Sequence, residues 1–238
     1  MSHSARPQGA AADARAGLLG GAREAREAGQ SAPAARERWL DAAESCYTRF
    51  GPAKTTVEDV AQAAGVSRAT LYRHFRTRDQ LLLAVIVREA GRLAAEAETE
   101  LRRFDDVGSW IVEGMLFCLR EIPSRPLLAM LFAPEEVGMA SRLVLTSERL
   151  LEIGAGILRP MFEPARQRGL LRESVRIEEL MEWVLRVLLS YLTVPSHLAR
   201  TDAELRHLLR VMILPAVLES PRGTPASENV LKKESRDG

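Results

Sequence analysis

The chain has 238 residues, 46% of them hydrophobic, so it can bury a substantial core in one large domain or two small ones. Its 33 basic and 32 acidic residues nearly cancel, which excludes a uniformly basic surface and leaves any anion-binding patch to be local. The two cysteines form no CxxC pair, no histidines stand at metal-ligand spacing, and no apolar run approaches the ~20 residues of a membrane span, so we expect a cytoplasmic protein without metal, cofactor or membrane association.

The two ends of the chain are poor in large apolar residues. Residues 1–33 consist mainly of Ala, Gly, Arg and Ser, and residues 220–238 are similarly polar. Such segments cannot bury enough surface to offset the entropy of ordering. We therefore expect a flexible N-terminal arm and a flexible C-terminal tail.

Four helices are predicted in the first sixty residues after the arm. Residues 36–50 carry an apolar stripe at spacings of three and four that stops at Gly51-Pro52. Thr56 can cap a second helix that ends at Gly65, and Ser67 can cap a short third helix that ends near Phe75. A fourth helix opens with the capping-box pattern TRDQ at 77–80.

The rest of the chain also has helical periodicity, interrupted by prolines and glycines. Alternating runs typical of strands are absent, which predicts an all-α fold. A second capping box, TDAE at 201–204, marks a helix start. The expected helices are 108–121, 124–133, 136–158, 160–168, 176–195 and 202–218.

The short third helix has one apolar edge and an outer face rich in hydrogen-bond donors. At 100° per residue, Leu71 and Phe75 share a face and should anchor the helix to its neighbours. Residues 60–78 contain four arginines and no acid, a local charge of +4 suited to phosphates. The second helix, the turn at Gly65 and this third helix form a helix-turn-helix, whose second helix enters the DNA major groove.

The outer face of this third helix offers candidate DNA contacts. Small Ala69 allows close approach to the groove, Arg68 could read guanine or clamp a phosphate, and Thr70 could contact a thymine methyl or a phosphate. Further phosphate contacts are expected from three side chains and from the free N–H groups at two helix starts. These are Tyr72, His74 and Arg78, and the N–H groups at Thr56 and Thr77.

The pattern T-x-E-D-V-A-x-x-A-G-V-S-x-x-T-L-Y-x-H-F-x-x-R-D-x-L, which begins at Thr56, resembles the DNA-binding region of TetR-family transcriptional repressors. The resemblance covers residues 34–83. It implies a three-helix DNA-binding domain at 34–80 and a larger helical domain for effector binding and dimerisation at 81–219. Ala69, His74 and Arg78 stand where the family often has Gly, Tyr or Lys. By resemblance, the residues that approach operator DNA are Thr56, Ser67, Arg68, Ala69, Thr70, Tyr72, His74 and Arg78.

A homodimer is expected, because one recognition helix reads too few base pairs for useful specificity. Residues 176–195 and 202–218 are apolar on more than one face and could form an intermolecular four-helix bundle, as the TetR family does, although both could instead be intrachain core. The expected interface residues are Leu180, Val184, Val187, Leu188, Tyr191, Leu205, Leu209 and Met212.

The middle of the chain supplies soft and aromatic side chains suited to an apolar cavity. Few charged residues interrupt these runs, so we expect a small hydrophobic effector, lipid-like, acyl-like or drug-like. It would favour the conformation with wrongly spaced recognition helices and so release a palindromic operator. The candidate lining residues are Trp110, Met115, Phe117, Met130, Phe132 and Trp183.

Other readings stay open beside a ligand-responsive repressor. A LacI-like regulator shares the A-x-x-A-G-V-S pattern but would continue into an α/β domain, which the helical periodicity argues against. An enzyme would need clustered catalytic groups, and the four histidines are scattered. The chain could also be an activator or a helical interaction protein that does not bind DNA. The arm's arginines could add DNA contacts or belong to a passive tail.

Overall fold

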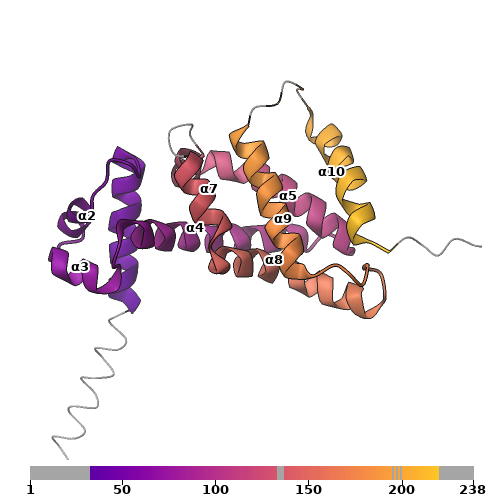
Figure 1. Cartoon of the computed structure of the whole chain (residues 1–238), viewed down its shortest axis with the longest axis horizontal. Coiled ribbons are helices and arrows are strands. Elements are labelled where there is room, and N and C mark those ends of the chain that lie inside the picture. Colours follow the sequence, from indigo (N-terminus) through magenta and orange to yellow (C-terminus); the bar gives the residue numbers. More distant parts are fainter. Residues whose placement is uncertain (1–32, 133–136, 195, 197, 199, 220–238) are drawn as a thin grey trace, which may run out of the picture. The chain divides into compact units, whose positions relative to one another are not determined.

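The computed structural model describes residues 33–132, 137–194, 196, 198 and 200–219 (Figure 1). Across these residues the elements are helices, joined by one isolated β-bridge between Leu171 and Leu218. The predicted all-α class is therefore confirmed. The expected tail and residues 1–32 of the expected arm lie outside the described residues, and residue 33 of the arm lies in a helix. No helix in the described ranges has the length and apolar character needed to cross a lipid bilayer.

The chain divides into two compact units, one up to Val85 and one from Ile86 onward. The first contains a helix at 33–50, α2 (Val57–Ala63), α3 (Arg68–His74) and the start of α4 (Arg78–Leu101). Gly51 and Gly65 have φ values of 84° and 66°, a left-handed conformation that favours glycine, and they turn the chain after the 33–50 helix and after α2. Fully buried side chains hold this unit together, among them Leu40, Tyr47, Val60, Leu71, Leu81 and Val85.

The second unit is built around α5 (Val107–Ser124), which packs against α6, α8, α9 and α10. Its order along the chain can be followed in Figure 1 from the magenta α5 to the yellow α10. The loop after α8 is tied to the end of α10, because the N–H of Arg172 donates to the carbonyl of Val217 over 3.0 Å. The other helices are α6 (Pro126–Leu131), α7 (Val137–Leu145), α8 (Glu148–Gln167), α9 (Ile177–Thr193) and α10 (Asp202–Val217).

One predicted helix break is wrong. The sequence reading placed it at Pro160, but Pro160 and Pro164 both lie inside α8, and the chain breaks instead before Ser147. The Ser147 hydroxyl accepts a hydrogen bond from the N–H of Leu150 and caps α8. Proline removes a backbone donor and usually ends a helix. Here a continuous buried face outweighs that loss, and it consists of Leu150, Ala155, Leu158, Phe162 and Ala165.

Two ion-pair groups tie helices of the second unit together. Arg125, at the junction of α5 and α6, reaches Glu89 over 2.7 Å and Glu96 over 2.5 Å, both on α4. Arg206 on α10 makes a two-pronged contact with Glu113 on α5, at 2.6 and 3.1 Å. Glu89 is only 8% exposed, so Arg125 supplies the countercharge that its burial requires.

Candidate DNA-binding surface and apolar cavity

The helix-turn-helix begins with a complete capping box. The Thr56 hydroxyl accepts from the N–H of Asp59 over 3.2 Å, and the N–H of Thr56 donates to the Asp59 carboxylate over 2.8 Å. Hydrogen bonds from the side chain and backbone of Thr56 lower the pKa of Asp59, because they favour its charged form. These bonds fix the residue at which α2, the first helix of the motif, begins.

The second helix of the motif, α3, is anchored as the helical wheel predicts. Leu71 is fully buried and Phe75 is 4% exposed. The Ser67 hydroxyl accepts from the N–H of Thr70 over 3.1 Å and lies 2.9 Å from the Thr70 hydroxyl. The exposed residues of α3 include Arg68, Ala69, Arg73 and His74. The helix therefore presents a small, donor-bearing face from a fixed apolar base.

Arg68 is held by two neighbours. Its Nη1 atom lies 2.6 Å from Oε1 of Glu58 on α2, and its guanidinium sits 5.1 Å from the centre of the Tyr72 ring. A hydrogen bond to Tyr72 and the charge of Glu58 raise the pKa of Arg68. Both members of the ion pair are largely solvent-exposed, so a DNA group can replace Glu58 at little cost.

Glu58 was missed as a site residue because it stands two positions before the acid-free window of residues 60–78. The Glu58 carboxylate adds one negative charge next to the four arginines of residues 60–78. The signal was available in the quoted motif, where this acid occupies the third position. Packing of α2 against α3 brings it to Arg68.

Two other predicted contacts have partners within the first unit. The ring of His74 packs against the Trp39 ring in a tilted arrangement, with centroids 4.6 Å apart and planes inclined at 52°. The Arg78 guanidinium donates to the carbonyl of Pro52 and is half-buried. The first unit thus contains all eight predicted DNA-contact residues, with Thr56, Ser67, Arg68, Ala69 and His74 exposed and Thr70, Tyr72 and Arg78 half-buried.

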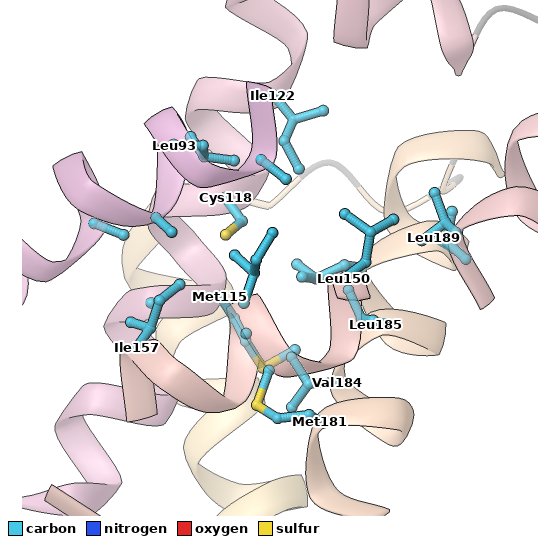
Figure 2. Close-up of a pocket in the computed structure, with 18 of the residues that line it drawn as sticks. Leu93, Met115, Cys118, Ile122, Leu150, Ile157, Met181, Val184, Leu185 and Leu189 are labelled. Atoms are coloured by element: carbon cyan, nitrogen blue, oxygen red, sulfur yellow. The ribbon is translucent and has the colours of Figure 1, made fainter. Parts of the chain in front are cut away.

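The second unit contains an apolar cavity of about 170 Å³ that is partly open to solvent and is bounded by α4, α5, α6, α7, α8 and α9. Figure 2 shows only carbon and sulfur atoms in the side chains drawn around it. Of the predicted lining residues, Trp110, Met115 and Phe132 do line it. Three do not: Phe117 is buried elsewhere, Met130 is half-buried, and Trp183 is 44% exposed at a separate depression between α9 and α10.

The polar atoms beside this cavity are already satisfied or uncharged. The indole N–H of Trp110 donates to the carbonyl of Phe104 over 2.9 Å. Burial raises the pKa of the Cys118 thiol to about 12, so it stays protonated at neutral pH. Sequence reasoning missed Cys118 and the small residues Ala90, Ala94 and Gly154 as lining residues, because nothing in their spacing distinguishes a cavity wall from ordinary core.

The predicted dimer residues divide between the interior and the outer face of α9 and α10. Leu180, Val184, Leu188 and Leu209 are buried within the chain itself. Val187, Tyr191 and Leu205 are half-buried, and Met212 is 66% exposed. Trp183 and Val211 are also exposed large apolar residues of these helices.

Comparisons with known proteins agree with this geometry. A family model described as bacterial regulatory proteins, tetR family, matches residues 40–85. A protein of Mycobacterium tuberculosis (strain ATCC 25618 / H37Rv), described as an uncharacterized HTH-type transcriptional regulator, Rv1255c, is 30% identical over 193 residues. That alignment covers 81% of this chain and 87% of the relative.

Solved structures share the fold. The TetR family repressor AlkX from Dietzia sp. strain DQ12-45-1b, described as implicated in biodegradation of n-alkanes, is 26% identical with a TM-score of 0.55. The match covers 76% of this chain and 93% of AlkX. RolR in complex with resorcinol has a TM-score of 0.60 at 16% identity, covering 79% of this chain and 90% of RolR.

Proposed function

The chain belongs to the TetR family of DNA-binding transcriptional regulators, and we propose that it is a homodimeric repressor that a small hydrophobic effector releases from a palindromic operator. The family comprises regulators rather than enzymes, in agreement with the absence of clustered catalytic groups that the sequence indicated. We propose that it acts in the cytoplasm, as a DNA-binding regulator of this family would. The observation that carries the proposal is the presence, in one chain, of an anchored donor-bearing helix and an apolar cavity.

In this proposal α3 lies in the major groove, with its N-terminal residues nearest the bases. Arg68 reads a base edge or holds a phosphate after leaving Glu58, and Ala69 lets the backbone come close. Tyr72 holds the Arg68 guanidinium through the cation–π contact. Thr56, Ser67, Thr70, His74 and Arg78 complete the proposed DNA surface.

The proposed dimer forms through the outer face of α9 and α10. Four of the predicted interface residues pack inside the chain's own core and would not contact the partner. They are Leu180, Val184, Leu188 and Leu209. The half-buried and exposed members, together with Trp183 and Val211, supply the contact. Such a dimer would place two α3 helices at half-sites about 34–36 Å apart or a multiple of that distance.

The proposed effector acts through α4. This helix begins at Arg78 in the first unit and presents Leu93, Ala94 and Ala97 to the cavity in the second. A ligand that binds better to one arrangement of α4 shifts the population of dimers toward that arrangement. The repressor names among relatives, such as AlkX and the HTH-type transcriptional repressor Rv1474c of M. tuberculosis, support repression over activation.

The test is binding of purified full-length protein to DNA from around its own coding region, followed as a function of salt. Arg68→Ala should weaken binding roughly tenfold to hundredfold, because it removes a candidate base contact. Arg149→Ala, in the second unit, removes the same charge from an exposed ion pair and should leave binding unchanged. Equal affinities for the two variants would move the contact surface away from α3.

A reporter gene under the bound promoter separates the alternative roles. Deletion of the regulator should raise expression if it represses and lower expression if it activates. A protein that binds no DNA in genome-wide mapping would be an interaction protein instead. The mapped neighbouring genes would also narrow the chemistry of the effector.

A further inference from the structure

The wall of the cavity bears no fixed charge among the described residues that line it. Its side chains are aliphatic, aromatic or sulfur-containing, and none has a carboxylate, amine, guanidinium, amide or hydroxyl group. Trp110 has already given its N–H to Phe104, and the Cys118 thiol is protonated. Among the described lining side chains, a polar ligand would therefore find only the weakly hydrogen-bonding Cys118 thiol.

A charged ligand would meet a still larger obstacle. A carboxylate or ammonium moved from water into apolar surroundings loses its hydration, and only a paired countercharge offsets that loss. Arg125 flanks the wall between the lining residues Ile122 and Leu128 but is not part of it. Its Nη1 and Nη2 atoms pair with Glu89 and Glu96, and its buried Nε has no hydrogen-bond partner among the described residues. Because Arg125 does not line the cavity, an acidic ligand inside it would meet no cation among the described lining residues.

The volume sets the size of the ligand. An apolar cavity of roughly 150 Å³ stays dry and holds one benzene molecule. The cavity of this chain is about 170 Å³, which suits one ring with a short alkyl substituent or a chain of similar carbon number. Ligands of ordinary drug size occupy about 300 Å³ or more, so they would extend out of this partly open cavity or require its walls to move.

We propose that the cavity selects a neutral, hydrocarbon-like molecule about the size of an alkylated benzene and rejects acids and amines of the same shape. The proposal rests on the proposed function for its role as the effector site, and it names the chemical class of that effector. The selection comes from the wall itself, because a neutral apolar molecule replaces empty space without leaving any polar group unpaired.

Three probes with the same phenyl ring and two-carbon branch test the selection. At pH 7 ethylbenzene is neutral, phenylacetate is anionic and phenethylamine is cationic, and the charged probes add only carboxylate oxygens or an ammonium group to that skeleton. Thermal unfolding of the full-length protein should shift upward by roughly 2 °C or more with ethylbenzene near its solubility limit. The two charged probes should bind at least about tenfold more weakly. No shift with ethylbenzene, or equal binding of a charged probe, would overturn the proposal.

Two leucine substitutions on α4 locate the binding. Ala94 lines the cavity, whereas Ala95 is exposed on the same helix. Ala94→Leu fills part of the cavity and should abolish the ethylbenzene shift, while Ala95→Leu should keep it. The melting temperature of each variant without ligand reports whether the fold is intact. A full shift in folded Ala94→Leu would place the ligand elsewhere and overturn the assignment.

DNA binding measured on the same samples separates this proposal from the proposed function. If the protein binds its DNA but not ethylbenzene, the proposed regulatory function stands and the proposed ligand class is wrong. If it binds ethylbenzene selectively but binds no DNA, the proposed ligand class stands and the proposed regulatory function is wrong. Release of bound DNA by ethylbenzene, and not by the charged probes, supports both.

Discussion

The two units of the chain use their side chains in opposite ways. In the first, a small apolar core supports exposed polar groups, and α3 is the clearest case, with Leu71 buried and Arg68 exposed. In the second, charged groups such as Glu113 and Arg206 lie around an interior that is apolar and partly empty. The proposed DNA contacts lie on the outside of the first unit, and the proposed effector site lies inside the second. A substitution should therefore have different consequences for DNA and ligand depending on the unit in which it lies.

The largest expected effect is from Leu71→Ala, which tests whether the surface of α3 depends on its buried base. Leu71 is fully buried, so truncation should lower the free energy of unfolding by about 3–5 kcal/mol. DNA binding should be lost with it. Denaturant unfolding measures the change, with exposed Arg73→Ala as the matched control on the same helix. A loss no larger than that of Arg73→Ala would contradict the role of Leu71 as anchor.

A smaller loss is expected in the second unit from Arg125→Met. This change leaves Glu89 buried with a weaker countercharge from Arg92, so the free energy of unfolding should fall by about 2–3 kcal/mol. The double variant with Glu89→Gln should recover part of the loss, since no buried charge then remains unpaired. If the changes in the free energy of unfolding from the two substitutions simply add, the Arg125–Glu89 ion pair contributes no interaction energy of its own. The second unit would then not depend on pairing its buried charge.

Two glycines of α8 sharpen the description of the cavity wall. Gly156 faces open space, so Gly156→Ala should stabilise the helix by up to about 1 kcal/mol. At Gly154 an added Cβ would lie 2.7 Å from Cε of Met181, so that side chain must move and the gain should shrink or vanish. Thermal unfolding of the pair measures the difference. Equal gains would mean that Met181 yields without cost.

The smallest effects compare the same capping device in both units. Thr56→Ala and Thr201→Ala should each lower stability by about 1 kcal/mol, because each removes a capping box. Only Thr56→Ala should also weaken DNA binding, since only that box lies in the helix-turn-helix. Helical circular dichroism and the DNA-binding assay measure the two effects. Weaker DNA binding in both variants would tie the cap of α10 to the DNA surface.

These caps also predict a dependence on pH. The pKa values of Asp59 and Glu204 are lowered in the folded chain by hydrogen bonds from Thr56 and Thr201. A carboxyl with a lowered folded pKa stabilises the fold above its unfolded pKa, and this stabilisation is lost as pH falls through the folded value. The difference in the free energy of unfolding between wild type and each threonine variant should therefore become smaller at acidic pH. A difference that stays constant down to pH 2 would exclude the carboxylates as its source.

The sequence by itself determined the helix-turn-helix and its orientation, because each part depends on local chemistry. Gly65 supplies a left-handed turn, Thr56 and Ser67 supply caps, and the spacing of Leu71 and Phe75 selects the buried side. All of these act within about one helical turn. The all-α class followed from periodicity in the same way.

Only the tertiary structure decided which residues meet across helices. It paired Glu58 with Arg68, packed His74 against Trp39, and kept α8 continuous through Pro160. It also chose Trp110, Met115 and Phe132 for the cavity wall and left Phe117 in ordinary core, although all four belong to apolar segments. An apolar pattern in the sequence predicts that a side chain is buried. Whether that side chain packs against another one or lines a cavity depends on how helices distant in the sequence pack together.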